Sequence, residues 1–96
     1  MTVVWTATAL GHLGALRQYI SQTSPFYAER MVQRILARAP QLAAFPDSGR
    51  MVPEVGRPEI REVIEGPYRV IYRHIADRVE VLAVVHGRQG SLGISG

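Results

Sequence analysis

The feature that most constrains the fold is the segment 60–86, where apolar residues alternate with polar ones and two short turns interrupt the alternation. Gly66-Pro67 is the first turn, and Ala76-Asp77 is short enough to be a tight hairpin turn. Strands joined by such turns run antiparallel and lie side by side. The predicted strands are about Ile60–Ile64, Tyr68–Ile75 and Val79–His86.

The N-terminal part predicts a strand and a first helix. Thr2–Trp5, with the sequence TVVW, is β-branched and aromatic, as strands often are. Thr6 or Thr8 is a suitable N-cap for the helix that follows. Gly14 would let a second helix approach this one closely. The apolar residues of its predicted buried face recur every three or four positions. They are Leu10, Leu13, Leu16 and Ile20.

A second helix is predicted to start at Ser24, a good N-cap, with Pro25 at the first helical position. Pro40 falls late in the helical pattern and predicts a kink or a restart as a short third helix. The turn-forming residues Phe45–Gly49 end it, and the two helices should form an antiparallel hairpin. The predicted buried stripe consists of Ala28, Val32, Ile35, Ala39 and Leu42.

These elements predict an α+β fold in a single domain, residues 1–96. The order is strand, helix, helix, strand, strand, strand, with the helical hairpin packed on one face of a mainly antiparallel sheet. Residues 50–59 are punctuated by proline and glycine and predict a loop. The small and polar residues 87–96 predict a frayed end.

The composition excludes several classes of protein. There is no cysteine, so disulfides, thiolate chemistry and Cys-based zinc sites are ruled out, and we predict neither a metal nor a cofactor. No apolar stretch approaches the roughly 18 residues of a membrane-spanning helix, and no signal peptide is evident. We therefore expect a soluble, cytoplasmic protein without membrane contact.

All eleven basic side chains are arginine, and the net charge is +3 at pH 7. A GC-rich genome would explain this bias. Alternatively, planar guanidinium groups suit the recognition of phosphates and carboxylates. Composition does not choose between these explanations, but the charge favours an acidic partner, either nucleic acid or an acidic polypeptide.

Strand alternation predicts an arginine-rich surface on the side of the sheet that the helices leave uncovered. Its members are Arg61, Arg69, Arg73, His86 and Arg88. This side would be concave, positive and imidazole-containing, whereas Tyr68 and Tyr72 face the core. Alternatively, the arginines only keep the sheet soluble and pair with glutamates across strands. Those glutamates are Glu62, Glu65 and Glu80.

Arg30, Arg34 and Arg38 follow one another at four-residue steps on the second helix. Like charges at this spacing destabilise a helix by a few tenths of a kcal/mol per pair. Either they form a solvated face, or they dock an acidic helix or nucleic acid.

Three segments, in this order, resemble the RelE/ParE superfamily, the toxins of bacterial type II toxin–antitoxin pairs. They are FPDSGRMVPE (Phe45–Glu54), IREVIEGPYRVIYR (Ile60–Arg73) and VEVLAVVHGR (Val79–Arg88). The resemblance covers the whole chain, and the pattern is most similar to the ParE-like "plasmid stabilisation" branch. It implies one fold with two activities: RelE-like members cut messenger RNA on the ribosome without a metal, and ParE-like members poison DNA gyrase.

For the nuclease, the resemblance implies specific roles. Arg69 in YRVIYR matches the arginine of the RelE motif YRLVY and would stabilise the phosphorane. Arg88 falls where RelE-like toxins place a second catalytic arginine or a histidine. His86 would act as the acid or base, and Glu62 is a weaker candidate for the base. However, the lysines and the C-terminal tyrosine or lysines of RelE-like enzymes are missing here.

We therefore predict a ParE-like toxin that binds a target such as DNA gyrase, with an mRNA endonuclease as the alternative and a degenerate, antitoxin-binding protein as a third possibility. Arg50, Arg61 and Arg73 are the predicted contacts to the target or to nucleic acid. The predicted partners are a cognate antitoxin, in a heteromeric complex, and either gyrase or the ribosome with its mRNA. The second-helix arginines are the predicted antitoxin contacts.

Overall fold

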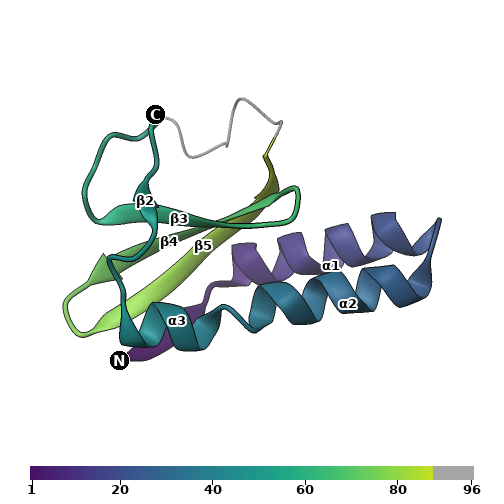
Figure 1. Cartoon of the computed structure of the whole chain (residues 1–96), viewed down its shortest axis with the longest axis horizontal. Coiled ribbons are helices and arrows are strands. Elements are labelled where there is room, and N and C mark those ends of the chain that lie inside the picture. The colour runs from purple at the N-terminus through teal and green to yellow at the C-terminus, as the bar shows by residue number, and fades with distance from the viewer. Residues whose placement is uncertain (88–96) are drawn as a thin grey trace.

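Two layers make up the protein, a five-stranded sheet and a set of helices on one of its faces (Figure 1). The computed structural model describes residues 1–87. The helices are α1 (Ala7–Ser21), α2 (Pro25–Leu36) and α3 (Ala39–Ala44). The strands are β1 (Thr2–Trp5), β2 (Arg50–Met51), β3 (Ile60–Glu65), β4 (Tyr68–Ile75) and β5 (Arg78–His86). The α+β fold, the helical hairpin and the antiparallel C-terminal strands are confirmed.

The helix boundaries follow the predicted caps. The Thr6 hydroxyl accepts a hydrogen bond from the Ala9 amide, and the Ser24 hydroxyl accepts one from the Tyr27 amide. Near Pro40 the helix stops and restarts, because a proline cannot donate the backbone hydrogen bond that a continuous helix needs. None of the helices within residues 1–87 is long and apolar enough to cross a membrane.

The sheet has the order β1-β5-β4-β3-β2. β1 runs parallel to β5, and the other neighbours are antiparallel. Beyond Trp5 the open edge of β5 is completed by Thr6, the N-cap of α1, and by His12 of α1: the Thr6 hydroxyl donates to the Val81 carbonyl, and the Val84 amide donates to His12 Nδ1. β2 lies in the segment predicted as a loop, and its two residues pair with Arg61 and Glu62.

The main core lies between the sheet and the helices. Leu13, Leu16 and the α2 residues Val32 and Ile35 are buried there, as predicted. The prediction was wrong for Leu10, which is 52% exposed. It was also wrong for Gly14, because a Cβ there would meet nothing within 4 Å.

A bulge in β5 changes the face on which its last residues lie. The register with β4 shifts between Ile71 and Tyr72, so that Leu82 is the extra residue of β5. Val81 and Val84 therefore both belong to the helix-side core, whereas Ala83 packs on the other face. Val81 and Ala83, two residues apart, therefore lie on opposite faces, because an extra residue interrupts the alternation of a regular strand.

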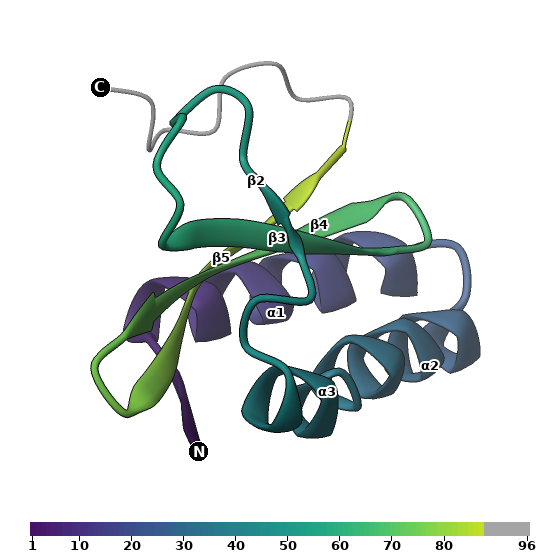
Figure 2. The ribbon, with the colours of Figure 1, turned by 60° about the vertical axis from the view of Figure 1, so that its left-hand side comes forward.

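The face opposite the helices is covered as well. The segment between β2 and β3 folds over it, on the side of the sheet away from the helices (Figure 2). Its Val52 is fully buried in a second apolar cluster with Ile60, Ile71 and Ala83. We call residues 52–59 the strap. The predicted loop is present, but the expectation that this face is open was wrong.

Candidate functional site

Arg69 lies beneath the strap, where two carboxylates hold its guanidinium. It is 6% exposed. Its Nη1 and Nη2 donate to the two oxygens of Glu54, at 2.8 and 3.0 Å, and its Nε donates to Glu62 Oε1 at 2.6 Å. The pair with Glu54 is bidentate, which is the strongest geometry for a guanidinium and a carboxylate. The side chain is therefore fixed to the protein itself.

The electrostatics follow from this geometry. The hydrogen bonds from Arg69 lower the pKa of Glu54 from 4.5 to about 2. The same bond to Glu54, followed by that to Glu62, raises the pKa of Arg69 above its ordinary value, although burial opposes this. Glu62 is itself buried, and its second oxygen accepts a hydrogen bond from Arg50. Two arginines and two glutamates thus form a neutral group on the strap side of the sheet.

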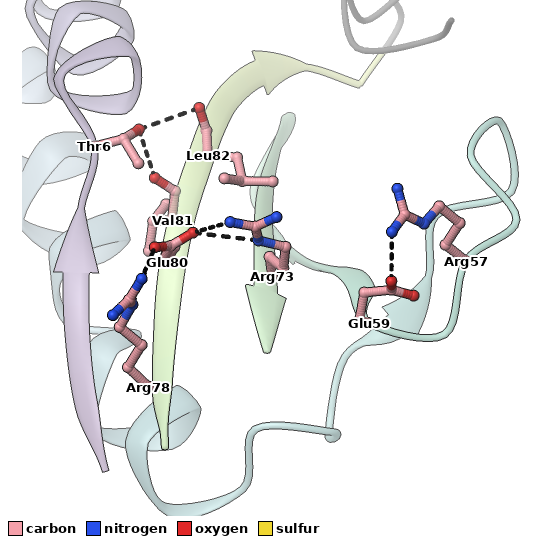
Figure 3. A network of polar contacts seen from close by, with 8 residues as sticks. All are labelled: Thr6, Arg57, Glu59, Arg73, Arg78, Glu80, Val81 and Leu82. Carbon is pink, nitrogen blue, oxygen red and sulfur yellow. Dashed lines mark hydrogen bonds and ion pairs between the residues drawn. The ribbon is translucent and has the colours of Figure 1, made fainter. Parts of the chain in front are cut away.

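Arg73 is also engaged, at the other end of this face (Figure 3). Its Nη2 donates to Glu80 Oε1 at 2.7 Å, and Arg78 contacts the second oxygen of Glu80 at 3.0 Å. Hydrogen bonds from Arg73 and then Arg78 lower the pKa of Glu80. Arg57 and Glu59, in the strap, form a separate exposed pair.

Arg61 lies on the helix side and anchors the turn before β2. Its Nη1 donates to the Gly49 carbonyl at 3.0 Å, and the Gly49 amide donates to the Tyr72 hydroxyl at 3.0 Å. Asp47 in the same turn contacts His74 Nδ1 at 3.0 Å. A Cβ at Gly49 would lie 2.5 Å from the Glu62 carbonyl oxygen, so only glycine fits. The conspicuous sequence FPDSGR is thus explained by packing.

The predicted shared positive surface is therefore wrong. Arg69 and Arg73 are each held by glutamates, as the alternative explanation held. Arg61 instead binds the Gly49 carbonyl on the helix side. His86 is paired with Tyr68, which belongs to the helix-side core, so it lies on the face opposite Arg69. Its ring contacts that of Tyr68 edge to face, with centroids 5.6 Å apart. Arg88 lies outside the described residues.

A hollow of about 230 Å³ opens at the end of the sheet beside the β3–β4 turn. We call it the sheet-end hollow. Apolar atoms dominate its wall, and Ile64 at its rim is 49% exposed. The lining residues are Ile64, Gly66, Pro67, Tyr68, Arg69, His86 and Gly87.

Arg30 and Arg34 lie on α2, whereas Arg38 follows its end at the N-cap of α3, so the three arginines predicted as one stripe of the second helix do not form a free stripe. Arg34 and Arg38 both bind Glu65 at the end of β3, at 2.8 and 3.1 Å. Arg38 also donates to the Ile64 carbonyl. Arg30 lies over the ring of Phe26, 5.9 Å from its centroid. Beside these residues, a second hollow of about 310 Å³ runs along α2, and we call it the α2 hollow.

Sequence reasoning missed two residues that organise these sites. Glu54 was treated as part of a loop, although its position in a segment long enough to cross the sheet was a possible signal. Phe26, which lines the α2 hollow, is 73% exposed. It stands outside the buried stripe of α2, and that could have marked it. Within residues 1–87, no cluster of three His, Asp or Glu side chains could hold a metal ion.

Comparisons with known proteins agree on one family. The family described as "ParE toxin of type II toxin-antitoxin system, parDE" matches residues 3–90. Toxin RelE2 of Caulobacter vibrioides is 39% identical over 85 residues, covering 88% of this chain and 92% of that protein. Putative toxin Y4kP of Sinorhizobium fredii is 39% identical over 88 residues, 88% of this chain and 86% of its own.

A solved structure shares the fold. The chromosomal ParDE toxin–antitoxin system from P. aeruginosa contains a chain that superposes with a TM-score of 0.73, at 24% identity. The superposition covers 90% of the chain described here and 95% of the other.

Proposed function

Because this chain belongs to the ParE/RelE family of toxins from type II toxin–antitoxin systems, we propose that it arrests growth by binding a cellular protein such as DNA gyrase. A cognate antitoxin neutralises it in a heteromeric complex. The proposed targets are cytoplasmic, and so is the toxin.

The observation that carries this proposal is the engagement of Arg69. Cleavage of RNA by the neighbouring 2′-hydroxyl needs a cation that can meet the phosphorane and an acid–base pair around it. Here a phosphate would have to displace both Glu54 and Glu62 from the guanidinium. Glu62 is buried, and His86 lies on the opposite face. This arrangement favours a toxin that works by binding.

A supercoiling assay tests the proposal. Purified toxin at micromolar concentration should inhibit gyrase, and the same toxin premixed with its antitoxin should not. A translation extract run in parallel should yield intact transcripts. Unchanged supercoiling together with ribosome-dependent cleavage would contradict the proposal.

One observation favours the alternative, a ribosome-dependent mRNA endonuclease. Tyr68, Arg69 and His86 all line the sheet-end hollow, even though the latter two lie on different faces. In that case His86→Ala should abolish transcript cleavage while the circular dichroism spectrum stays unchanged. Expression without antitoxin separates both activities from the third possibility, because a degenerate toxin would leave growth unaffected.

A further inference from the structure

The outer face of α2 carries a second stripe of residues at helical spacing, opposite its buried one. The buried residues of α2 are Ala28, Met31, Val32 and Ile35. Four exposed residues repeat the same steps of three, one and three positions, and we call them the outer stripe. They are Phe26, Glu29, Arg30 and Gln33. In both ribbon views α2 runs along the outside of the molecule, so a stripe on its outer face can meet another molecule (Figures 1 and 2).

The surface of the outer stripe is hollowed and mainly apolar. All four of its residues line the α2 hollow, together with Arg34. Apolar atoms make up almost all of the wall, because the long polar side chains contribute their aliphatic stems beside the Phe26 ring. That ring belongs to a side chain that is 73% exposed. A partner that covers the α2 hollow would remove this apolar surface from water, which stabilises a complex.

The two charged residues of the outer stripe are neighbours of opposite sign, and both can take a further partner. Arg30 lies over the Phe26 ring, and within residues 1–87 no carboxylate contacts it. Glu29 is half exposed, with one oxygen 3.5 Å from Arg17 Nε and the other accepting a hydrogen bond from Gln33 at 3.1 Å. A carboxylate has about four acceptor sites, so Glu29 can accept from another donor as well.

The outer stripe has the same spacing when it is read from either end of the helix, and the charges at its centre then exchange places. An antiparallel copy of α2, related by a twofold axis between residues 29 and 30, would therefore bring Glu29 against Arg30 of the second copy. Phe26 would face Gln33 of the second copy, inside its α2 hollow. A twofold interface makes every contact twice, so both ion pairs and both phenylalanine contacts form together. A parallel pairing would oppose like charges instead.

We propose that the outer stripe is a self-association surface, on which a second copy of this chain docks with its α2 antiparallel to the first. This goes beyond the proposed function, because it concerns the free chain and not its target. An acidic segment or a phosphate backbone fits less well, since either would meet Glu29 beside Arg30. A surface that presents the two charges in reverse order satisfies both of them. One helix on each side makes a small interface, so the dimer should be weak and should depend on concentration.

Charge reversal tests this pairing, because the two charges can be reversed separately or exchanged. Glu29→Arg alone and Arg30→Glu alone each place like charges opposite one another, twice in every dimer. The exchanged variant, which carries both substitutions, restores both ion pairs. Arg57→Glu and Glu59→Arg are matched controls, since they change the net charge by the same amounts in an exposed ion pair of the strap.

Sedimentation equilibrium of each full-length chain, from about 10 micromolar to 1 millimolar, measures the dissociation constant of the dimer in a range that covers weak interfaces. Each single reversal in the outer stripe should raise this constant at least about tenfold. The exchanged variant and the two controls should stay within about threefold of the wild type. An equimolar mixture of the two single variants should associate like the wild type, because each offers the charge that the other lacks. Thermal melts identify any variant that is unfolded.

A wild-type chain that stays monomeric over the whole range would overturn the proposal. So would a mixture of the two folded single variants that fails to associate, or controls that weaken the dimer as much as the reversals do. If the wild type is monomeric and the reversals weaken binding of the antitoxin instead, the antitoxin occupies the outer stripe and the second copy is wrong. The supercoiling assay is independent of all these results, so the proposed function is tested separately.

Discussion

At the scale of single residues, the side chains that most resembled a functional signal turn out to be held by the fold. Arg69 lies in the motif that carries the family resemblance, yet Glu54 and Glu62 engage its guanidinium. Gly49 lies in another such motif and is fixed by its contact with the Glu62 backbone. A motif can thus be shared because the fold needs it, whatever the activity.

Two glycine substitutions should have opposite effects. At Gly49 an added Cβ would lie 2.5 Å from the Glu62 carbonyl oxygen and 2.7 Å from the Tyr72 hydroxyl. Gly49→Ala should therefore lower the free energy of unfolding by about 1–3 kcal/mol. Gly14 is in an exposed part of α1 with open space around it, so Gly14→Ala should raise that free energy by about 0.5–1 kcal/mol. Urea titrations measure both changes in the free energy of unfolding. Changes of the same sign for the two variants would contradict the packing around Gly49 and Gly14.

Glu62 should be the most sensitive of the paired acids. Its side chain is fully buried between Arg50 and Arg69. Glu62→Gln removes the negative charge that offsets a buried guanidinium, and such a loss costs about 3–5 kcal/mol. Glu59→Gln is the control, because its exposed pair with Arg57 should contribute almost nothing measurable. Similar urea concentrations at the midpoint of unfolding for the two variants would show that the buried Arg69 guanidinium does not need the charge of Glu62.

At the scale of elements, the strands and helices could be predicted because their boundaries rest on local chemistry. Ser24 with Pro25, the Pro40 restart and the Ala76 turn all act within a few residues. The β5 bulge could not be predicted, because Leu82 is as apolar as its neighbours and leaves the alternation looking unbroken. The strap was missed for a different reason: the sequence of a loop does not indicate which face of the sheet the loop covers. These two features moved His86 to the other face and buried Arg69, so the candidate site was predicted less well than the fold.

The strap should respond to a change in its apolar contact. Val52 is fully buried in the second cluster, so Val52→Ala removes two methyl groups and leaves a cavity. The cost should be about 1–3 kcal/mol. Hydrogen exchange should accelerate first in residues 52–59 while α1 stays protected. Val4→Ala, at a position 42% exposed, is the control. Uniform acceleration over the whole chain would mean that the strap is no separate unit.

At the scale of the whole molecule, the charges form pairs. Seven of the eight acidic residues contact at least one arginine, and Arg69, Arg34 with Arg38, and Arg73 with Arg78 tie separate elements together. The net charge of +3 suggested that the protein has a surface that binds an acidic ligand. Pairing leaves the net charge unchanged, but it places a carboxylate beside most of the arginines within residues 1–87. The net charge could be calculated from the sequence. Which charged residues pair with each other depends on which strands and helices lie next to each other.

This pairing predicts how the protein responds to acid. Arg69 lowers the pKa of Glu54 to about 2. A backbone hydrogen bond and then Arg57 lower the pKa of Glu59, and hydrogen bonds from Arg73 and Arg78 lower that of Glu80. In the unfolded chain the same groups titrate near 4.5, so between these values the unfolded state binds more protons than the folded one. The contribution of these carboxylates to stability should therefore be fully present above about pH 5 and be lost as the pH is lowered towards about 2. Thermal melts over this range measure it. The stability of Glu54→Gln should fall less steeply with decreasing pH than that of the wild type, because the variant no longer takes up a proton at this position on unfolding. Parallel curves of stability against pH for the two proteins would show that the Arg69–Glu54 contact does not set the acid response.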